Sequence, residues 1–419
     1  MTDRVRSLHV STTQGYAGTL VKDGQHVFTY DIGTVDPERP ERAISLTMPA
    51  RAASWQTTPM LPVFQTFLPE GFLKDHIRAR FGKVMRIDDM ALLALTGDGA
   101  IGRIRVARDK PAGGTQKTNA ESLAEILADQ GARDLFEYLC DKYLLSTSIA
   151  GVQPKVVVPL EPAPGAQGKA GIGERATLRG RQLIVKVDSG DFPDLAENEY
   201  HCLSIAQHCP ALLRLPAFHL SADRRRLAIE RFDLAGDGAY LGFEDMVALQ
   251  GRVNDDKYDG SYESIAATIR NNCSPLLVAE SLQRYFASLV FAVAVRNGDA
   301  HLKNFGLLYT DPSTADCALS PLFDQVCTTF FIAQDMLALR LARSKAWPDR
   351  PALEAFGRDH CAVSRPDLVI DEIIDAVAAY RPRIDGPVWQ RLKPILDLAA
   401  AALTHGRSPS RSRVRGPRP

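Results

Sequence analysis

Two polar residues in a short loop have the types and spacing that phosphoryl transfer requires. The loop RNGDAHLKNFG follows the long apolar segment SLVFAVAV, and Asp299 and Asn304 form a D-x-x-x-x-N pair within it. A carboxylate at the first position can accept the proton of an attacking hydroxyl, and the amide oxygen of the asparagine can hold a magnesium ion. Asp324 ends the run LSPLFD, where a kinase keeps its second metal ligand. The pattern predicts transfer of phosphate from ATP and magnesium, with Asp299 as the catalytic base.

Residues upstream of this loop could bind the nucleotide. Lys186 interrupts the apolar run LIVKV, where an ammonium group is costly to bury unless it meets an anion such as an ATP phosphate. We expect Glu199 to be its carboxylate partner, with Glu197 as the second choice. The run LAIERFD ends at Glu230 and Phe232, which could offer backbone groups and an aromatic ring to adenine in a segment that connects two lobes.

Each of these residues also has an ordinary explanation. Asp and Asn in a glycine-containing loop usually form turns or caps, and a lysine in a strand usually extends its ammonium group to solvent. Lys303 could act catalytically by steadying the transferred phosphate, or it could be solvated. His301 has no cysteine or second histidine at ligand spacing, so we place it beside the nucleotide and expect it to bond the loop backbone. The order and spacing of all the features together favour a kinase.

The composition describes a globular chain with more than one unit. Its 419 residues exceed the size at which a single core stops growing. Lys plus Arg and Asp plus Glu both total 50, so a chain that mainly coats nucleic acid or an anionic membrane is not expected. The seven cysteines contain no C-x-x-C pair, which disfavours a disulfide framework or a zinc site. The start MTDRVRSLHV has no apolar signal core, and we expect a cytoplasmic protein without membrane contact.

Patterns along the chain predict four segments. Short β-like runs with turn signals, followed by the helical spacing of FQTFLPEGFLKDHIRARFG and IDDMALLALTG, predict a small α/β subdomain in residues 1–110. Residues 111–235 contain the β-rich runs KVVVPL, LIVKVD and RRLAIERFDL. Residues 236–405 are strongly helical, and SLQRYFASLVFAV has an apolar stripe that predicts a buried helix before the loop. Residues 406–419 are rich in arginine and are expected to be a disordered basic tail.

The sequence resembles the HipA-type serine/threonine kinases, which are toxins of type II toxin-antitoxin systems, over nearly its whole length. The resemblance implies an α+β, two-lobed protein-kinase-like fold, with a β-rich N-lobe and a helical C-lobe, behind the N-terminal subdomain. It also implies ATP and Mg²⁺, with the ion on Asn304 and Asp324. The motifs that carry it are LPEG (68–71), SIAGVQPK (148–155), FPDLAENEY (192–200), ERFD (230–233), EDM (244–246), NGDAHLKNFGLL (297–308) and PLFD (321–324).

The resemblance assigns a phosphate-covering loop to the segment that contains Ser148, Ala150 and Gly151. It maps an autophosphorylated serine onto Ser148, although the STS run offers Ser146 and Thr147 as alternatives. These hydroxyls could also simply cap a turn after the preceding helix. A phosphoserine here would add about two negative charges beside the nucleotide phosphates and would switch the enzyme off.

The resemblance further implies a growth-arresting toxin that phosphorylates serine on a component of the translation machinery, such as an aminoacyl-tRNA synthetase. Its implied partner is a HipB-like antitoxin with a helix-turn-helix domain, through which operator DNA would mainly be contacted. Two alternatives remain open from the sequence. The chain could be a catalytically weak corepressor module that binds an antitoxin, or a small-molecule kinase on a related fold.

Overall fold

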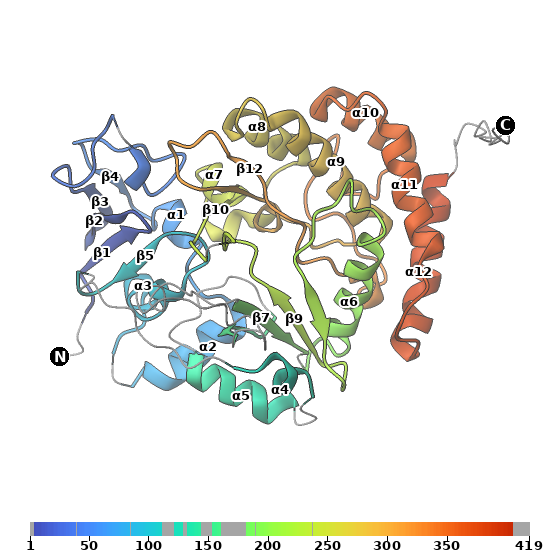
Figure 1. Cartoon of the computed structure of the whole chain (residues 1–419), viewed down its shortest axis with the longest axis horizontal. Helices are drawn as coiled ribbons and strands as arrows, with labels where there is room; N and C mark the ends of the chain where they lie inside the picture. The colour runs from blue at the N-terminus through green and yellow to red at the C-terminus, as the bar shows by residue number, and fades with distance from the viewer. Residues whose placement is uncertain are drawn as a thin grey trace, which may run out of the picture.

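The computed structural model describes residues 4–38, 40–83, 85–110, 121–128, 132–143, 153–160, 182–188, 190–236 and 238–404. The expected phosphate-covering loop, with Ser146, Ser148, Ala150 and Gly151, and the expected basic tail both lie outside these ranges. Figure 1 shows a sheet at the N-terminal end, a second sheet in the middle of the chain and a layer of helices towards the C-terminal end. Within the described ranges no helix is both long enough and apolar enough to span a membrane.

The N-terminal subdomain is built on a five-stranded antiparallel sheet. The order is β4-β3-β2-β1-β5, with β1 Ser7–Thr12, β2 Gly15–Asp23, β3 Gln25–Tyr30, β4 Trp55–Thr57 and β5 Arg105–Ala107. Alternate residues of these strands are buried and pack on helices α1 Pro62–Gln65 and α3 Asp89–Thr96. The short η1 Pro40–Arg42 and η2 Gly97–Gly99 complete the subdomain.

The segment between α1 and α2 departs from the sequence expectation. The spacing predicted helix throughout residues 64–82, but α1 ends at Gln65 and α2 spans Gly71–Phe81. Pro69 disfavours helical backbone at the residue before it, Glu70 is extended, and Gly71 has a φ of 50°. The chain therefore turns at this point, and Glu70 lies outside α1 and directly before α2.

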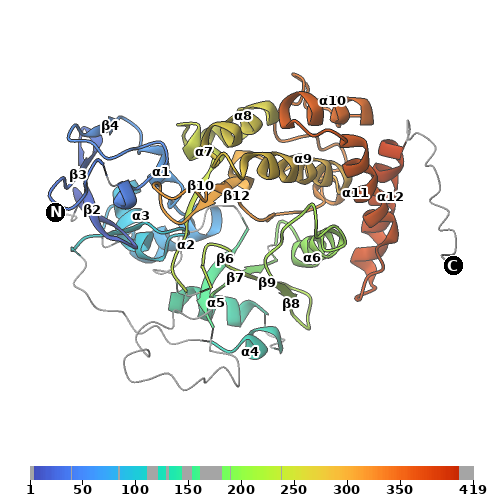
Figure 2. The same cartoon turned by 45° about the horizontal axis from the view of Figure 1, so that its top comes forward.

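The second sheet forms the β-rich lobe. Its order is β6-β7-β9-β8, all antiparallel, with β6 Lys155–Pro159, β7 Gln182–Val187, β8 Phe218–Leu220 and β9 Arg226–Glu230. One face packs on α4 Leu123–Ala128 and α5 Ala132–Tyr143, while α6 Leu195–Ala206 packs on β8 and β9 (Figure 2). Because successive strand residues point to opposite faces, the residues between the core positions of β6 and β7 face away from α5.

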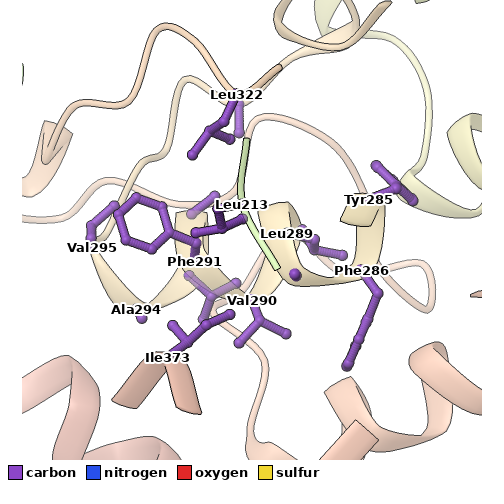
Figure 3. Packing of buried hydrophobic residues seen from close by; sticks show 14 of the residues in the cluster. Leu213, Tyr285, Phe286, Leu289, Val290, Phe291, Ala294, Val295, Leu322 and Ile373 are labelled. Atoms are coloured by element: carbon purple, nitrogen blue, oxygen red, sulfur yellow. The ribbon is translucent and has the colours of Figure 1, made fainter. Parts of the chain in front are cut away.

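The helical lobe is organised round α9 Val278–Ala294. The predicted stripe of Leu282, Tyr285, Phe286, Leu289, Val290 and Val293 is buried, and Figure 3 shows part of its packing. The helix delivers the chain directly into the loop that contains Asp299, so the buried stripe fixes where that loop begins. The other elements are β10 Gly242–Asp245, α7 Met246–Leu249, η5 Asn254–Tyr258, α8 Tyr262–Asn272, η6 Leu302–Asn304, β11 Gly306–Tyr309, β12 Ala318–Leu319, η7 Thr328–Phe330, α10 Arg350–Cys361, α11 Pro366–Ala379 and α12 Pro387–Thr404.

Candidate active site

A cleft with a volume of about 840 Å³ lies where the N-terminal subdomain, the β-rich lobe and the helical lobe meet. Its size suits a small-molecule site. Glu199 lies behind this surface against Lys186. The predicted site residues that line the cleft are Lys186, Glu230, Phe232, Asp299, His301, Lys303, Asn304 and Asp324.

Lys186 joins two carboxylates from distant segments. Its ammonium group donates a hydrogen bond of 2.6 Å to Glu199 Oε1 and a second hydrogen bond to Asp324 Oδ1. Burial favours the neutral amine, but the charges of Asp324 and Glu199 outweigh it and raise the pKa of Lys186. Glu197 instead pairs with Arg224 at 3.2 Å, so the structure brings the first-choice carboxylate to Lys186 and not the second.

Side-chain and backbone hydrogen bonds hold the loop that contains Asp299 and Asn304 against the Asp324 segment. The amide nitrogen of Asn297 donates to the carbonyl of Asp324 at 3.1 Å, and its oxygen accepts from the backbone of Asp299 at 3.1 Å. The amide nitrogen of Asn304 donates to the carbonyl of Asp299 at 3.0 Å. Asp324 has a φ of 52°, in the left-handed region that non-glycine residues rarely adopt. The side chains of Asp299, Asn304 and Asp324 thus open into one cleft.

The donor set fits a magnesium ion. Because the nitrogen of Asn304 is bound to the loop backbone, its amide oxygen remains as the group that can face a cation. Asp324 adds a carboxylate, and oxygen ligands of these types suit Mg²⁺. Within the described ranges no group of three or more His, Cys, Asp or Glu side chains could hold a metal ion. An ion at Asn304 and Asp324 would therefore take its other ligands from nucleotide phosphates and water.

His301 lines the cleft together with Asp299 and Asp324. Burial lowers its pKa, while the charges of Asp299 and Asp324 oppose that shift. The ring packs edge-on against Tyr258 with centroids 5.0 Å apart, and its buried Nδ1 has no hydrogen-bond partner in the described part of the chain. The hydroxyl of Tyr258 donates to Asp299 Oδ1 at 2.7 Å, which is the geometry expected of an acceptor hydroxyl at a catalytic base.

The opposite end of the cleft is apolar. Phe232 lies 5.3 Å from Phe323 and 5.5 Å from Phe243 between ring centroids. Ile184 and Ile229 from the sheet also line this end. Flat apolar walls beside the end of β9 could hold a purine ring, and this is where the sequence placed the adenine contact.

Among the charged residues that line the cleft, Lys155, Glu70 and Lys257 were assigned no role from the sequence, although Lys155 and Glu70 belong to motifs of the family resemblance. Lys155 pairs in register with Lys186 on the adjacent strand, lines the cleft, and is buried. Glu70 accepts hydrogen bonds from Lys303 at 2.7 Å and from Lys257 at 3.2 Å. Lys303 is only 8% exposed, so the alternative of a solvated side chain is wrong, because a carboxylate of the N-terminal subdomain covers it.

The β-rich lobe, the helical lobe and the cleft between them define a kinase-like, two-lobed α+β fold. The family described as "HipA N-terminal domain" matches residues 8–107, and the "HipA-like C-terminal domain" matches residues 147–381. The chain therefore belongs to the HipA family.

Relatives and solved structures agree with this assignment. "Putative kinase Y4dM" of Sinorhizobium fredii is 30% identical over 407 residues, covering 91% of this chain and 90% of the relative. "Putative kinase Y4mE" of the same organism is 27% identical over 349 residues, covering 78% of each chain. HipA of Shewanella oneidensis MR-1, solved in a complex with HipB and its operator DNA, superposes with a TM-score of 0.66 at 18% identity, covering 95% of this chain and 96% of that one. The structural likeness extends across all three parts of the fold.

Proposed function

We propose that this protein is an ATP- and magnesium-dependent kinase that phosphorylates serine or threonine hydroxyls of proteins. The observation that carries the proposal is the meeting of Asp299, Asn304, Asp324 and the Lys186–Glu199 pair at one cleft of about 840 Å³. These are the parts that phosphoryl transfer uses, because it depends on positioning and on neutralising charge. The kinase names of two relatives support the same class.

Each part has a role in this proposal. Asp299 accepts the proton of the acceptor hydroxyl, while Lys186 and Lys155 face the phosphates as two neighbouring cations. Asn304 and Asp324 would hold a magnesium ion, which would supply positive charge to neutralise the transferred phosphate. Phe232 and the apolar end of the cleft hold the adenine.

We further propose a cytoplasmic toxin that arrests growth by phosphorylating a component of the translation machinery, with Ser148 as the residue whose autophosphorylation limits activity. Membership of the HipA family supports the toxin role. The Shewanella relative was solved with HipB and operator DNA, which supports a HipB-like antitoxin as partner and contact with DNA mainly through that partner.

The decisive experiment is transfer of labelled phosphate from ATP with magnesium, followed by mass spectrometry of the products. We expect label on the STS segment or on a protein acceptor. Asp299→Asn should reduce transfer by about 10²–10⁴-fold, as loss of a general base does, and should keep ATP affinity and the folded state. Asp191→Asn is the matched control, because Asp191 is an exposed carboxylate that lines the same cleft.

Two outcomes would contradict the proposal. Equal transfer by Asp299→Asn and the unaltered chain would remove the catalytic assignment. The second candidate function is a corepressor module, which the Shewanella complex with HipB and operator DNA supports. A chain that binds an antitoxin but no ATP would have this function instead.

A further inference from the structure

A carboxylate of the N-terminal subdomain reaches into the catalytic loop of the helical lobe. Both oxygens of Glu70 are used, since Oε1 accepts from Lys303 Nζ at 2.7 Å and Oε2 accepts from Lys257 Nζ at 3.2 Å. Lys303 also donates to Asn254 Oδ1 at 2.9 Å. All three charged side chains are largely buried. One carboxylate thus holds two ammonium groups that come from different turns, η5 and η6.

A second contact fixes the same turn from the same subdomain. The backbone nitrogen of Asn254 donates to Gln65 Oε1 at 2.8 Å, and its side-chain nitrogen donates to the Gln65 carbonyl at 2.9 Å. Gln65 is itself buried and anchored to the carbonyl of Met60. Two residues of the N-terminal subdomain therefore bind η5: Gln65 at the end of α1 contacts Asn254, and Glu70 before α2 contacts Lys257.

The electrostatics make the Glu70 contact persistent. Burial alone would raise the pKa of Glu70, but Lys303 and Lys257 lower it to about 2. The carboxylate is therefore ionised at any pH at which the protein works. Without it, the largely buried ammonium of Lys303 would lose the carboxylate that compensates its charge and would be expected to move towards solvent.

The position of Lys303 connects this contact to catalysis. It belongs to η6, Leu302–Asn304, and directly precedes Asn304, the residue suited to hold the metal. The other lysine, Lys257, is followed by Tyr258, whose hydroxyl contacts Asp299. Displacing either ammonium group would displace a residue that touches the reacting groups.

Resting on the kinase function proposed above, we propose that Glu70 is a positioning residue for phosphoryl transfer. Its carboxylate fixes Lys303, and through Lys303 the turn that presents Asn304, so the N-terminal subdomain is an integral part of the active site. Loss of this contact should lower kcat much more than it changes ATP binding, because Glu70 has no hydrogen bond to Lys186 and acts on Lys155 only through its charge.

A second interface of the same subdomain provides the control. Buried Glu244 of β10 accepts hydrogen bonds from Ser45 Oγ at 2.5 Å and from the Leu46 nitrogen at 2.8 Å. These residues do not line the cleft. We therefore expect Ser45→Ala to weaken the attachment of the subdomain and to leave the loop of Asp299 and Asn304 in place.

The experiment compares Glu70→Gln, Glu70→Asp and Ser45→Ala in the full chain. It measures kcat and the KM for ATP in phosphate transfer, the affinity for ATP by calorimetry, and the thermal midpoint. In Glu70→Gln an amide nitrogen must face one of the two lysines. We expect kcat to fall by about 10–100-fold, as for a displacement of catalytic groups by roughly 1 Å, with the KM and ATP affinity little changed. Glu70→Asp should recover part of kcat, and Ser45→Ala should keep kcat even where its thermal midpoint falls equally.

The outcomes separate the two proposals. Equal kcat in Glu70→Gln and Ser45→Ala would show that Glu70 only attaches the subdomain. An unaltered chain that transfers no phosphate would refute the kinase function itself. If the unaltered chain transfers phosphate and Glu70→Gln has the same kcat, only the positioning role of Glu70 is overturned.

Discussion

Replacing Lys186 by methionine should separate what the buried charge cluster does for stability from what it does for the nucleotide. Lys186 connects Asp324 to Glu199, whose side chain has no exposed surface, and Lys155 is its cross-strand neighbour. Lys186→Met removes the ammonium group that hydrogen-bonds both carboxylates and leaves the fully buried Glu199 without that partner.

The expected cost follows from that burial. Removing one partner of a buried ion pair typically destabilises a protein by about 3–5 kcal/mol, and we expect Lys186→Met to fall in that range. Adding Glu199→Gln to the same chain removes the buried carboxylate and leaves an amide that burial tolerates better. The double variant should therefore recover most of the lost stability. It should still fail to bind ATP, because no ammonium group at position 186 meets the phosphates.

The experiment compares the unaltered chain with Lys186→Met, Glu199→Gln and the double variant. Urea unfolding followed by circular dichroism measures the free energy of unfolding, and calorimetry measures the affinity for ATP. A loss below about 1 kcal/mol in Lys186→Met, the size expected of an exposed pair, would contradict the reasoning. So would a double variant no more stable than Lys186→Met. ATP binding by the double variant would remove Lys186 from the nucleotide site.

Three further perturbations test other parts of the site. Tyr258→Phe removes the hydroxyl that competes with an acceptor for Asp299. The KM for the acceptor should fall about 5-fold, which corresponds to one hydrogen bond of roughly 1 kcal/mol. Steady-state kinetics measures this, and a fall in kcat instead would contradict it. Gly298→Ala places a Cβ 2.5 Å from the Met336 carbonyl. This overlap should lower the free energy of unfolding by about 1–3 kcal/mol and displace the loop that contains Asp299. We expect both a lower thermal midpoint and a loss of phosphate transfer. Asp188 follows β7 and accepts hydrogen bonds from the backbone nitrogens of Asp194 and Ala196 at the start of α6. Burial raises its pKa to about 6, above the roughly 3.9 of an unfolded chain. The stability that protonated Asp188 contributes is therefore complete below about pH 4 and is lost as the pH rises through 6. Asp188→Asn should reduce the fall of the thermal midpoint between about pH 4 and 6. A fall as steep as in the unaltered chain would exclude Asp188 as its cause.

The residues that the sequence analysis found are those whose signal is local. Asp299 and Asn304 share one loop, and the loop begins where the buried stripe of α9 ends. Lys186 stands out because a charge in an apolar strand is unfavourable without a partner. In each case the evidence lies within a few neighbouring residues, which periodicity and spacing can detect.

The only signal for Glu70 was its place in the LPEG motif (68–71), which carries the family resemblance but assigns the residue no role. Its partner Lys303 lies 233 residues away, so neither periodicity nor spacing could join the two. For the same reason Lys303 was open to a solvated interpretation. Contacts of this kind follow from how the N-terminal subdomain docks, and docking depends on surface shape that a pattern along the chain does not contain.

For Lys155, the alternation along the strand predicts the direction of the side chain but not the residue that it pairs with on the neighbouring strand. Buried Val156 and Val158 place Lys155 on the other face of β6, so its direction could be predicted from alternation. Its register against Lys186 could not, because a short turn sets register in hairpins and the chain between Pro159 and Gln182 is far longer than a turn. The register matters for function. Burial lowers the pKa of Lys155, and Lys186 beside it acts in the same direction, so this pair of ammonium groups is favourable only while several negative charges face it. A polyphosphate that binds here adds such charges to those of Asp324 and Glu199, and it would bind more strongly than a ligand with a single charge.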